Sequence, residues 1–342
     1  MIKKYFLFIF FQIFTILSIF IIFEIGLRFY FQENVSYNCY QSVKDERKYF
    51  NGVNCYQIEK YFEKQAPTLY VTDDKGVRIG KKLANKNSKK IYFVGDSFTF
   101  GALSNYEETY PYNSVKYYNE NSDMPKISEV NLGVNGYQFI QNYIMIKKLA
   151  KAHSSSLIIY GLTPNDIFDI ESFNTKKIIL NNSMIDKIKN KIDNMNLISI
   201  KFLTSIVLKN DRVYNFLYDK RGESAGYIQE NGTKSWEKKY LILKNELNNL
   251  DHNIKNRLII TIIPQQIQIR LLKIGKINDA LSFDKKILEI CKDTGIKCVS
   301  FTEKMSERLN YKTHFTKDGH LYPLANIEYG KLLGEYLVLK GY

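Results

Sequence analysis

The chain has 342 residues, of which 25% are charged and 45% hydrophobic, and its formal net charge is +14. This length fits one α/β domain of ordinary size plus an appendage. The lysines are scattered and often lie beside Asn, Asp or Glu, and the sequence has no aromatic-basic module. We therefore expect a solvated basic surface and no nucleic-acid partner. A basic face also suits an anionic membrane surface or an acidic glycan.

The first apolar segment, Tyr5–Phe23, contains no charged residue. At about 1.5 Å per residue it spans roughly 28 Å, close to the hydrocarbon thickness of a bilayer. Lys3 and Lys4 precede it, and positive residues tend to stay in the cytoplasm, so we predict the N-terminus inside and the rest of the chain outside. A cleaved signal peptide is the alternative. Residues 23–28 have no Ala-x-Ala-like cleavage site, which favours an uncleaved anchor.

The chain then divides into four parts: a cytoplasmic tail (1–4), a membrane anchor (5–23), a juxtamembrane segment with small strands (24–88) and a main domain (89–342). Outside the cytoplasm, four cysteines permit two disulfides, for which Cys39–Cys55 and Cys291–Cys298 close the shortest loops. Four free thiols remain the alternative.

Strands alternate with helices along the main domain. Short strands are predicted at Leu69–Thr72 and Val77–Ile79, on either side of a turn. The following elements are then predicted in chain order: strand Lys90–Val94, helix Glu107–Asn121 with Pro111 in its first turn, strand Ile127–Leu132, helix Tyr137–Ala152, strand Leu157–Tyr160, helix Trp236–Asn249, strand Arg257–Ile263, helix Ser282–Lys292, strand Lys297–Phe301 and helix Pro323–Leu339. This alternation predicts a parallel five-stranded sheet with helices on both faces, a three-layer α/β/α sandwich.

The segment Asp169–Gly232 interrupts this pattern as an insertion. Its apolar positions at Ile185–Ile192 and at Leu197–Leu208 suggest helices. We expect it to lie over the sheet edge and to form a cap.

Four short polar segments lie at the carboxyl ends of predicted strands or in loops, where open α/β sheets bind ligands. They are Gly95-Asp96-Ser97, Asn131–Tyr137, Pro164-Asn165-Asp166 and Lys317–Leu321. The glycines of the second segment, Gly133 and Gly136, allow a backbone N–H to approach a ligand closely.

Together these segments supply the parts for acyl transfer. Ser97 is the candidate nucleophile, His320 the candidate base, and Asp318 the carboxylate that would hold the imidazole in the right tautomer. The backbone N–H groups of Ser97 and Gly136 and the side-chain amide of Asn165 are candidates for an oxyanion hole, in which each donor is worth on the order of 3 kcal/mol.

The set resembles the SGNH hydrolase superfamily, also called the GDSL esterases. The name-giving residues map to Ser97, Gly136, Asn165 and His320, and the family's aspartate maps to Asp318. The stretches KKIYFVGDSFTFG, VNLGVNGY, LIIYGLTPND and HFTKDGHLYP occur in the order seen in membrane-anchored bacterial members. The resemblance covers roughly residues 70–342, with the insertion unmatched, and implies a flavodoxin-like sheet.

Two departures from the family pattern stand out. Many members of the superfamily have Asp-x-x-His, whereas Asp318-Gly319-His320 resembles the Asp-x-His variant of the polysaccharide-modifying branch. The third segment reads Gly-Leu-Thr-Pro-Asn-Asp in place of Gly-x-Asn-Asp, which leaves the position of Asn165 open.

Several polar residues near these segments have a structural interpretation. We expect Asp96 to cap the helix after the nucleophile, and Asp166 to be a cap as well. His314 either binds substrate or is a surface or hydrogen-bonded loop residue. His153 and His252 are placed in polar linkers.

The resemblance implies a membrane-anchored esterase or O-acyltransferase that passes an acyl group, acetyl in the branch it resembles, through a covalent ester on Ser97. The anchor and the basic surface suggest a cell-envelope glycan as substrate, and a membrane acyl-transfer partner is implied by resemblance alone. We expect no metal and no organic cofactor. The alternatives are a lipid esterase, with an acyl groove built from Leu197–Leu208, and a non-catalytic glycan-binding module on the same fold.

Overall fold

The computed structural model describes most of the main domain and the N-terminal helix. The described residues are 2–31, 40–43, 47, 49–59, 61, 63–64, 66–80, 88–168, 170–171, 199, 234–309, 312–315 and 318–342. Both helices predicted within the insertion therefore lie outside the described residues, except for Ser199.

Five strands form one parallel sheet in the order β6-β5-β7-β8-β9. The chain goes from β5 to its neighbour β6, crosses to the other side of β5 for β7, and continues outward to β8 and β9. This is the strand order of a flavodoxin-like sheet, which the family resemblance implied. The strands are β5 (Lys89–Gly95), β6 (Ile127–Asn131), β7 (Leu157–Leu162), β8 (Leu258–Ile262) and β9 (Lys297–Ser300).

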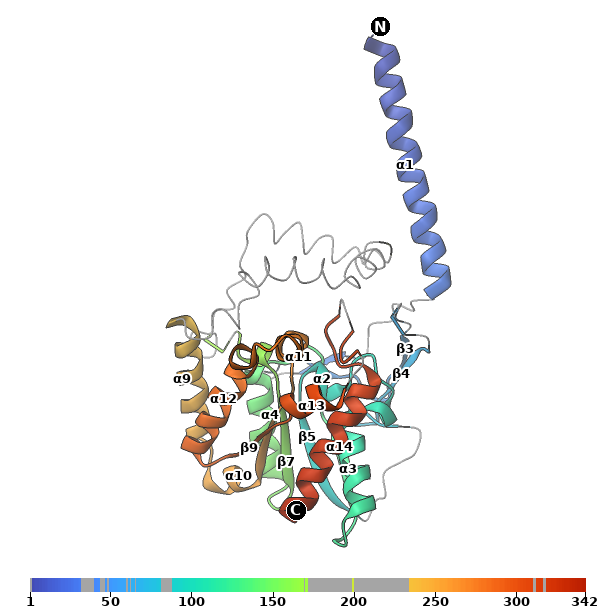
Figure 1. Ribbon diagram of the computed structural model, residues 1–342. Coiled ribbons are helices and arrows are strands. Elements are labelled where there is room, and N and C mark those ends of the chain that lie inside the picture. Colours follow the sequence, from blue (N-terminus) through green and yellow to red (C-terminus); the bar gives the residue numbers. More distant parts are fainter. Residues whose placement is uncertain are drawn as a thin grey trace.

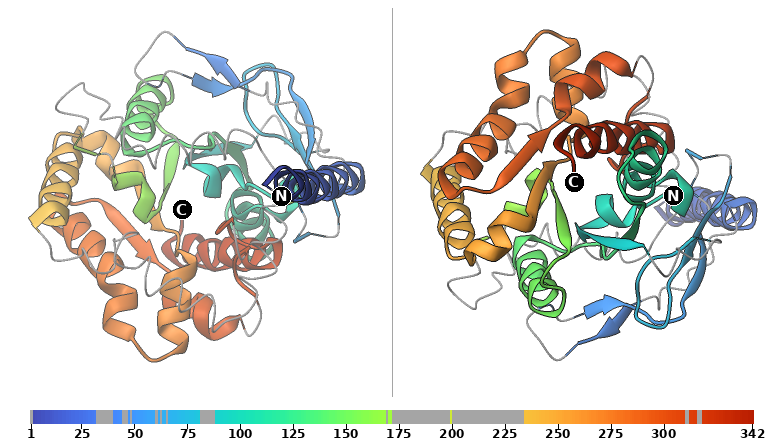
Figure 2. Two further views of the ribbon diagram at one scale, coloured as in Figure 1. Left: turned by 90° about the horizontal axis from the view of Figure 1, so that it is seen from above. Right: turned by 90° about the horizontal axis from the view of Figure 1, so that it is seen from below.

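Helices cover both faces of the sheet, so the predicted three-layer sandwich is confirmed (Figures 1 and 2). Side chains alternate along β5, with Tyr92 and Val94 packing into one core and Ile91 and Phe93 into the other. The first core includes residues of α4 (Phe139–Ala152), α9 (Lys234–Asn248) and α12 (Ile277–Thr294). The second includes residues of α3 (Tyr110–Asn121), α13 (Thr302–Arg308) and α14 (Pro323–Lys340).

Some predicted boundaries were wrong. The helix predicted from Glu107 starts as a 3₁₀ turn, η1 (Tyr106–Glu108), and α3 then begins at Tyr110 with Pro111 in its first turn as predicted. The prediction missed α13 and also α10 (His252–Arg257) and α11 (Gln266–Lys273). His252 was placed in a linker, but it begins α10, which buries Ile254 against the core.

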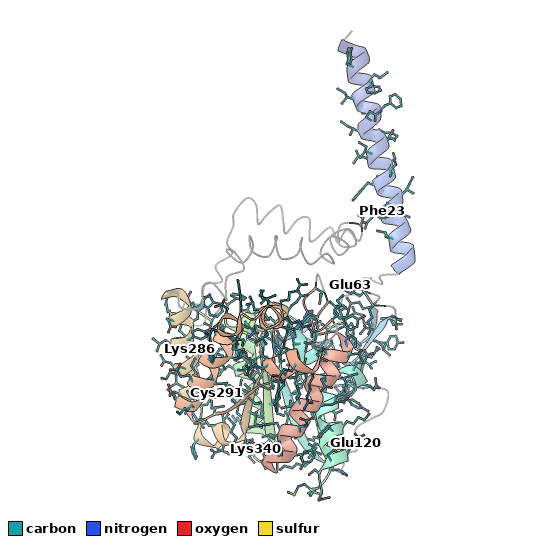
Figure 3. All side chains as sticks on the ribbon, viewed as in Figure 1. Phe23, Glu63, Glu120, Lys286, Cys291 and Lys340 are labelled. Carbon is teal, nitrogen blue, oxygen red and sulfur yellow. A yellow bond between two sulfur atoms is a disulfide. The ribbon has the colours of Figure 1, made fainter. Side chains whose placement is uncertain are left out.

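The N-terminal helix α1 (Ile2–Phe31) is longer than the predicted anchor. Its stretch Leu7–Leu27 is long and apolar enough to cross a membrane, although a signal sequence would pass the same test. The helix stands away from the domain, and most of its described side chains are exposed, Phe23 among them (Figure 3). It touches the insertion at one described residue, since the carboxylate of Glu24 accepts hydrogen bonds from the N–H and hydroxyl of Ser199 at 2.8 and 2.6 Å.

Two small antiparallel ribbons follow α1. The first pairs β1 (Tyr40–Ser42) with β2 (Tyr49–Asn51), and the second pairs β3 (Tyr56–Glu59) with β4 (Thr68–Val71). Of the two short strands predicted around the turn, Leu69–Thr72 corresponds to β4. The segment Val77–Ile79 forms only isolated bridges, from Arg78 to Thr72 and to Asn131 at the end of β6.

Arg78 holds this N-terminal segment onto the main domain. Its side chain is fully buried, and its guanidinium lies between the rings of Tyr70 and Phe100, 4.8 and 4.5 Å from their centroids. It donates hydrogen bonds to the carbonyl oxygens of Phe100, Gly101 and Ser104. These residues lie at the end of and just after the short helix that begins at Ser97, so Arg78 fixes the loop behind the candidate nucleophile.

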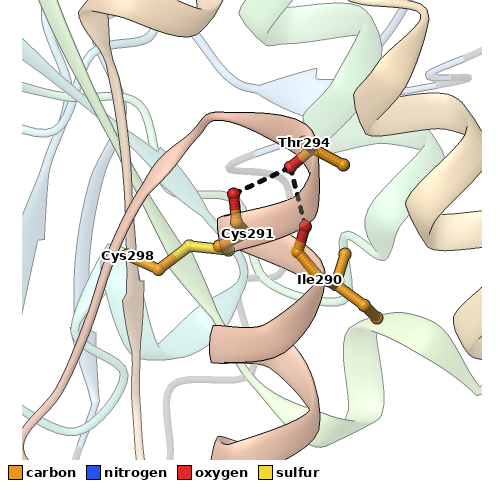
Figure 4. The surroundings of a disulfide bond; sticks show 4 residues. All are labelled: Ile290, Cys291, Thr294 and Cys298. Carbon is orange, nitrogen blue, oxygen red and sulfur yellow. Dashed lines mark hydrogen bonds between the residues drawn. A yellow bond between two sulfur atoms is a disulfide. The ribbon is translucent and has the colours of Figure 1, made fainter.

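A disulfide between Cys291 and Cys298 ties the end of α12 to β9, with a Cα–Cα distance of 6.0 Å (Figure 4). The hydroxyl of Thr294 donates to the carbonyl oxygens of Ile290 and Cys291 and closes the last turn of the helix. Cys55 is disulfide-bonded as well, and Cys39 lies outside the described residues. Of the two alternatives that the sequence leaves open for Cys291 and Cys298, the structure therefore has the disulfide.

We expect Arg78→Met to lower the free energy of unfolding by roughly 2–4 kcal/mol, because three buried carbonyl oxygens lose their donor. Urea unfolding measures this loss. Arg308→Met is the matched control, since Arg308 is exposed and pairs with Glu328 and Glu335. Exposed pairs contribute about 1 kcal/mol or less. Equal losses in the two variants would contradict a special role for Arg78.

Candidate active site

Ser97 is the first residue of α2 (Ser97–Phe100), directly after β5. The carboxylate of Asp96 accepts a hydrogen bond from the N–H of Phe98 at 2.9 Å. The prediction that Asp96 caps this helix is therefore confirmed.

His320 links the predicted nucleophile to the predicted carboxylate. Its Nε2 lies 2.5 Å from the hydroxyl oxygen of Ser97, and its Nδ1 is hydrogen-bonded to the carboxylate of Asp318. With the proton of a neutral imidazole on Nδ1, Nε2 is free to accept the proton of the Ser97 hydroxyl. The two chain segments that carry these residues are 223 positions apart, and the fold brings them into hydrogen-bond contact.

The short Asp-x-His spacing works because Gly319 is left-handed, with φ at 86°. This turn lets one carboxylate oxygen of Asp318 accept from both the ring Nδ1 and the backbone N–H of His320, the latter at 3.2 Å. Phe98 packs against the His320 ring at 4.8 Å between centroids. The imidazole is thus held on two sides.

His314 anchors the loop that carries His320. It is buried, with its Nε2 3.0 Å from the carbonyl oxygen of Pro264 and its Nδ1 2.8 Å from the Thr313 hydroxyl. Burial lowers the pKa of His314 to about 4, so the ring stays neutral and donates to Pro264. Of the alternatives left open by the sequence, His314 is therefore the hydrogen-bonded loop residue, and it is buried rather than on the surface.

The surroundings of His320 favour the protonated ring more than water does. Burial opposes the charged form, but the negative charges of Asp318 and Asp96 outweigh it, so the pKa of His320 is raised above its usual value of 6.5. The pKa of a base that accepts a proton from serine and later returns it is best placed near the working pH.

Asn165 lies in a 3₁₀ turn, η2 (Pro164–Ile167), that begins right after β7 and Thr163. Its side-chain nitrogen donates to Asp96 at 3.0 Å, and its side-chain oxygen accepts from Gln265 at 3.2 Å. Although the spacing before Asn165 differs from the family pattern, its side-chain amide still lies beside the turn that carries Ser97. One amide hydrogen is used by Asp96, and the second has no acceptor in the part of the chain that the structure describes.

Asp166 is a cap, as predicted. Its carboxylate accepts from the N–H of Thr163 at 2.8 Å and from its hydroxyl at 3.2 Å. The same hydroxyl lies 3.1 Å from Asp96. Burial raises the pKa of Asp166 well above its usual range, and the nearby charge of Asp96 adds to this effect.

Gly136 lies in the loop after β6 and has a left-handed backbone, with φ at 78°. The loop is fastened to β5, since the N–H of Val134 donates to the carbonyl oxygen of Gly95 at 3.1 Å. Ser97, Gly136 and Asn165 thus follow the carboxyl ends of three adjacent strands, β5, β6 and β7.

Sequence reasoning missed two features of this site. The bond between Asp96 and Asn165 joins two of the predicted segments. The ribbon strand β2 also packs on the loop of Gly136, where the hydroxyl of Tyr49 donates to the carbonyl oxygen of Asn135 at 3.0 Å. No motif marked Tyr49, because residues 24–60 show no clear periodicity.

No family model and no curated protein matches this chain. Similar solved structures include a lipolytic G-D-S-L family protein from Veillonella parvula, which is 12% identical over 74% of this chain and 100% of its own, with a TM-score of 0.41. A catalytic mutant of an acetylxylan esterase from Geobacillus stearothermophilus is 13% identical over 76% of this chain and 97% of its own, with a TM-score of 0.41. An α/β hydrolase from the metagenome of Lake Arreo is 11% identical over 75% of this chain and 95% of its own, with a TM-score of 0.42.

We expect the rate at which a fluorophosphonate labels Ser97 to rise with pH, with a midpoint above 6.5, because only neutral His320 accepts the serine proton and its pKa is raised. Labelling is lost as the pH falls through that pKa. Asp318→Asn removes the negative charge that favours the imidazolium, so it moves the midpoint down and slows labelling by roughly 10²-fold or more. An unchanged midpoint in this variant would contradict the role given to Asp318.

Proposed function

We propose that this protein is a serine esterase or O-acyltransferase of the SGNH type, which passes an acyl group through a covalent ester on Ser97. One observation carries the proposal: His320 is hydrogen-bonded to both the hydroxyl of Ser97 and the carboxylate of Asp318. A serine that merely caps a helix requires no such base and no such carboxylate.

In the first half-reaction, the Ser97 oxygen attacks the carbonyl carbon of the ester while its proton passes to Nε2 of His320. Asp318 stabilises the imidazolium that forms. His320 then gives the same proton to the oxygen of the departing alcohol, and the C–O bond to that alcohol breaks. The acyl group remains on Ser97.

Hydrogen-bond donors must stabilise the negative charge that develops on the carbonyl oxygen of the ester. The N–H groups of Ser97 and Gly136 and the second amide hydrogen of Asn165 are proposed to supply them. In support, neither of the two N–H groups donates to an acceptor in the described part of the chain. Each donor would contribute on the order of 3 kcal/mol to the transition state.

In the second half-reaction, His320 takes a proton from an incoming hydroxyl, which attacks the acyl-serine. Water as acceptor gives hydrolysis, and a sugar hydroxyl gives transfer by the same steps. Which acceptor prevails depends on how well the site excludes water.

We propose a cell-envelope glycan carrying acetyl esters as substrate and an extracytoplasmic position for the domain. The apolar stretch of α1 supports membrane tethering, and the disulfide Cys291–Cys298 supports an oxidising compartment. The net charge of +14 suits an anionic envelope surface. The carboxyl edge of the sheet also lies toward the end of the domain from which α1 extends, opposite the C-terminus (Figure 1).

The test is hydrolysis of p-nitrophenyl esters from acetyl to long-chain acyl. We expect short-chain activity that falls about 10⁴-fold or more in Ser97→Ala and His320→Ala. Ser154→Ala and His252→Ala, both exposed and remote from the triad, are the matched controls and keep wild-type activity.

A long-chain preference would favour the lipid esterase. Labelling of Ser97 by a fluorophosphonate without turnover would favour a transferase that lacks its acceptor. Neither turnover nor labelling, in a chain that is folded by circular dichroism, would leave the glycan-binding module as the better explanation.

A further inference from the structure

The ribbon of β1 and β2 contacts the loop of Gly136 through hydrogen bonds that run in both directions. The Tyr49 hydroxyl donates to the carbonyl oxygen of Asn135 at 3.0 Å, and the Asn51 amide donates to that of Gly133 at 3.0 Å. In the opposite direction, the Tyr137 hydroxyl donates to the carbonyl oxygen of Tyr49 at 2.5 Å. The rings of Tyr49 and Tyr137 meet edge to face at 5.4 Å.

The bond from Tyr49 acts on one particular peptide unit. The carbonyl of Asn135 and the N–H of Gly136 belong to the same peptide plane. In a trans peptide these two groups point in opposite directions, and the plane is rigid. A donor that holds the carbonyl oxygen on one side therefore holds the N–H on the other side, away from Tyr49.

The Tyr49 hydroxyl also lies close to Gly136 itself. A Cβ atom added to Gly136 would lie 2.9 Å from the Tyr49 hydroxyl oxygen, and φ at 78° is a conformation that side chains disfavour. Because Gly136 has no side chain, the peptide between Asn135 and Gly136 can rotate unless a contact restrains it. Tyr49 supplies that restraint from outside the main domain.

We propose that Tyr49 is a positioning residue for the oxyanion hole, which aims the Gly136 N–H at the oxygen of the reacting ester by holding the Asn135 carbonyl. This inference rests on the proposed function. The bond also polarises the peptide, which makes its N–H a better donor when negative charge develops. Because the bond acts through the Asn135 peptide, the effect is expected on the transition state and not on substrate binding.

The test compares two Tyr→Phe variants in the full chain, solubilised in detergent and assayed with p-nitrophenyl acetate. Tyr49→Phe removes the bond to the Asn135 carbonyl. Tyr137→Phe removes the other tyrosine bond between ribbon and loop but leaves that peptide unit held. Each variant keeps its ring and loses one hydroxyl, so their stability losses should be similar.

We expect kcat and kcat/KM of Tyr49→Phe to fall together by about ten-fold, with KM unchanged, which marks an interaction made only in the transition state. The rate of Ser97 labelling should fall in parallel, and the midpoint of its pH dependence should stay where it is, because His320 is untouched. Tyr137→Phe should keep kcat within about two-fold.

Equal losses of kcat in both variants, tracking a loss of thermal stability, would overturn the inference and leave Tyr49 a structural contact. A Tyr49→Phe variant with full kcat would also overturn it, while the serine mechanism would stand. If the wild-type chain neither turns over the ester nor labels at Ser97, the proposed function fails and the inference fails with it.

Discussion

The carboxylate of Asp96 joins the parts of the site. It is fully buried, and no Lys or Arg neutralises it among its described contacts. Instead one oxygen accepts from the N–H of Phe98 at the start of α2, and the other accepts from the Thr163 hydroxyl and the Asn165 amide. Burying an ionised carboxylate is costly unless hydrogen bonds replace its water. Here those bonds come from the turns after β5 and β7, so the requirement to solvate Asp96 also fixes the turn of Ser97 against the side chain of Asn165.

The strand order explains why three turns can meet at this point. β5 is flanked by β6 and β7, and the connections leave it in opposite directions. A crevice forms at the carboxyl ends of strands where the order reverses, because the helices on either side diverge there. Ser97, the loop of Gly136 and Asn165 line that point from three adjacent strands. His320 comes from a fourth segment, whose loop is fastened to the end of β8 by His314 and Pro264.

The sequence contained enough to predict the sheet, because buried parallel strands such as β7 and β8 are continuous apolar runs with clear ends. It also singled out Ser97, His320 and Asp318, because their residue types and order are informative before any contact is known, and the structure places these three side chains in hydrogen-bond contact. It could not identify contacts set by tertiary packing. α11 was missed because its helical pattern is short and follows Pro264 directly, and the role of Arg78 was missed because a buried arginine paired with carbonyl oxygens looks like a surface residue in the sequence.

Tyr49 shows most clearly where sequence motifs stop being informative. A motif records residues that touch the reacting atoms, whereas the direction of a backbone N–H is set by whatever holds the carbonyl of the same peptide. In this chain that restraint comes from β2, whose ribbon begins at Tyr40, a short segment after α1 ends at Phe31. The residues that join the apolar helix to the domain therefore also support its site.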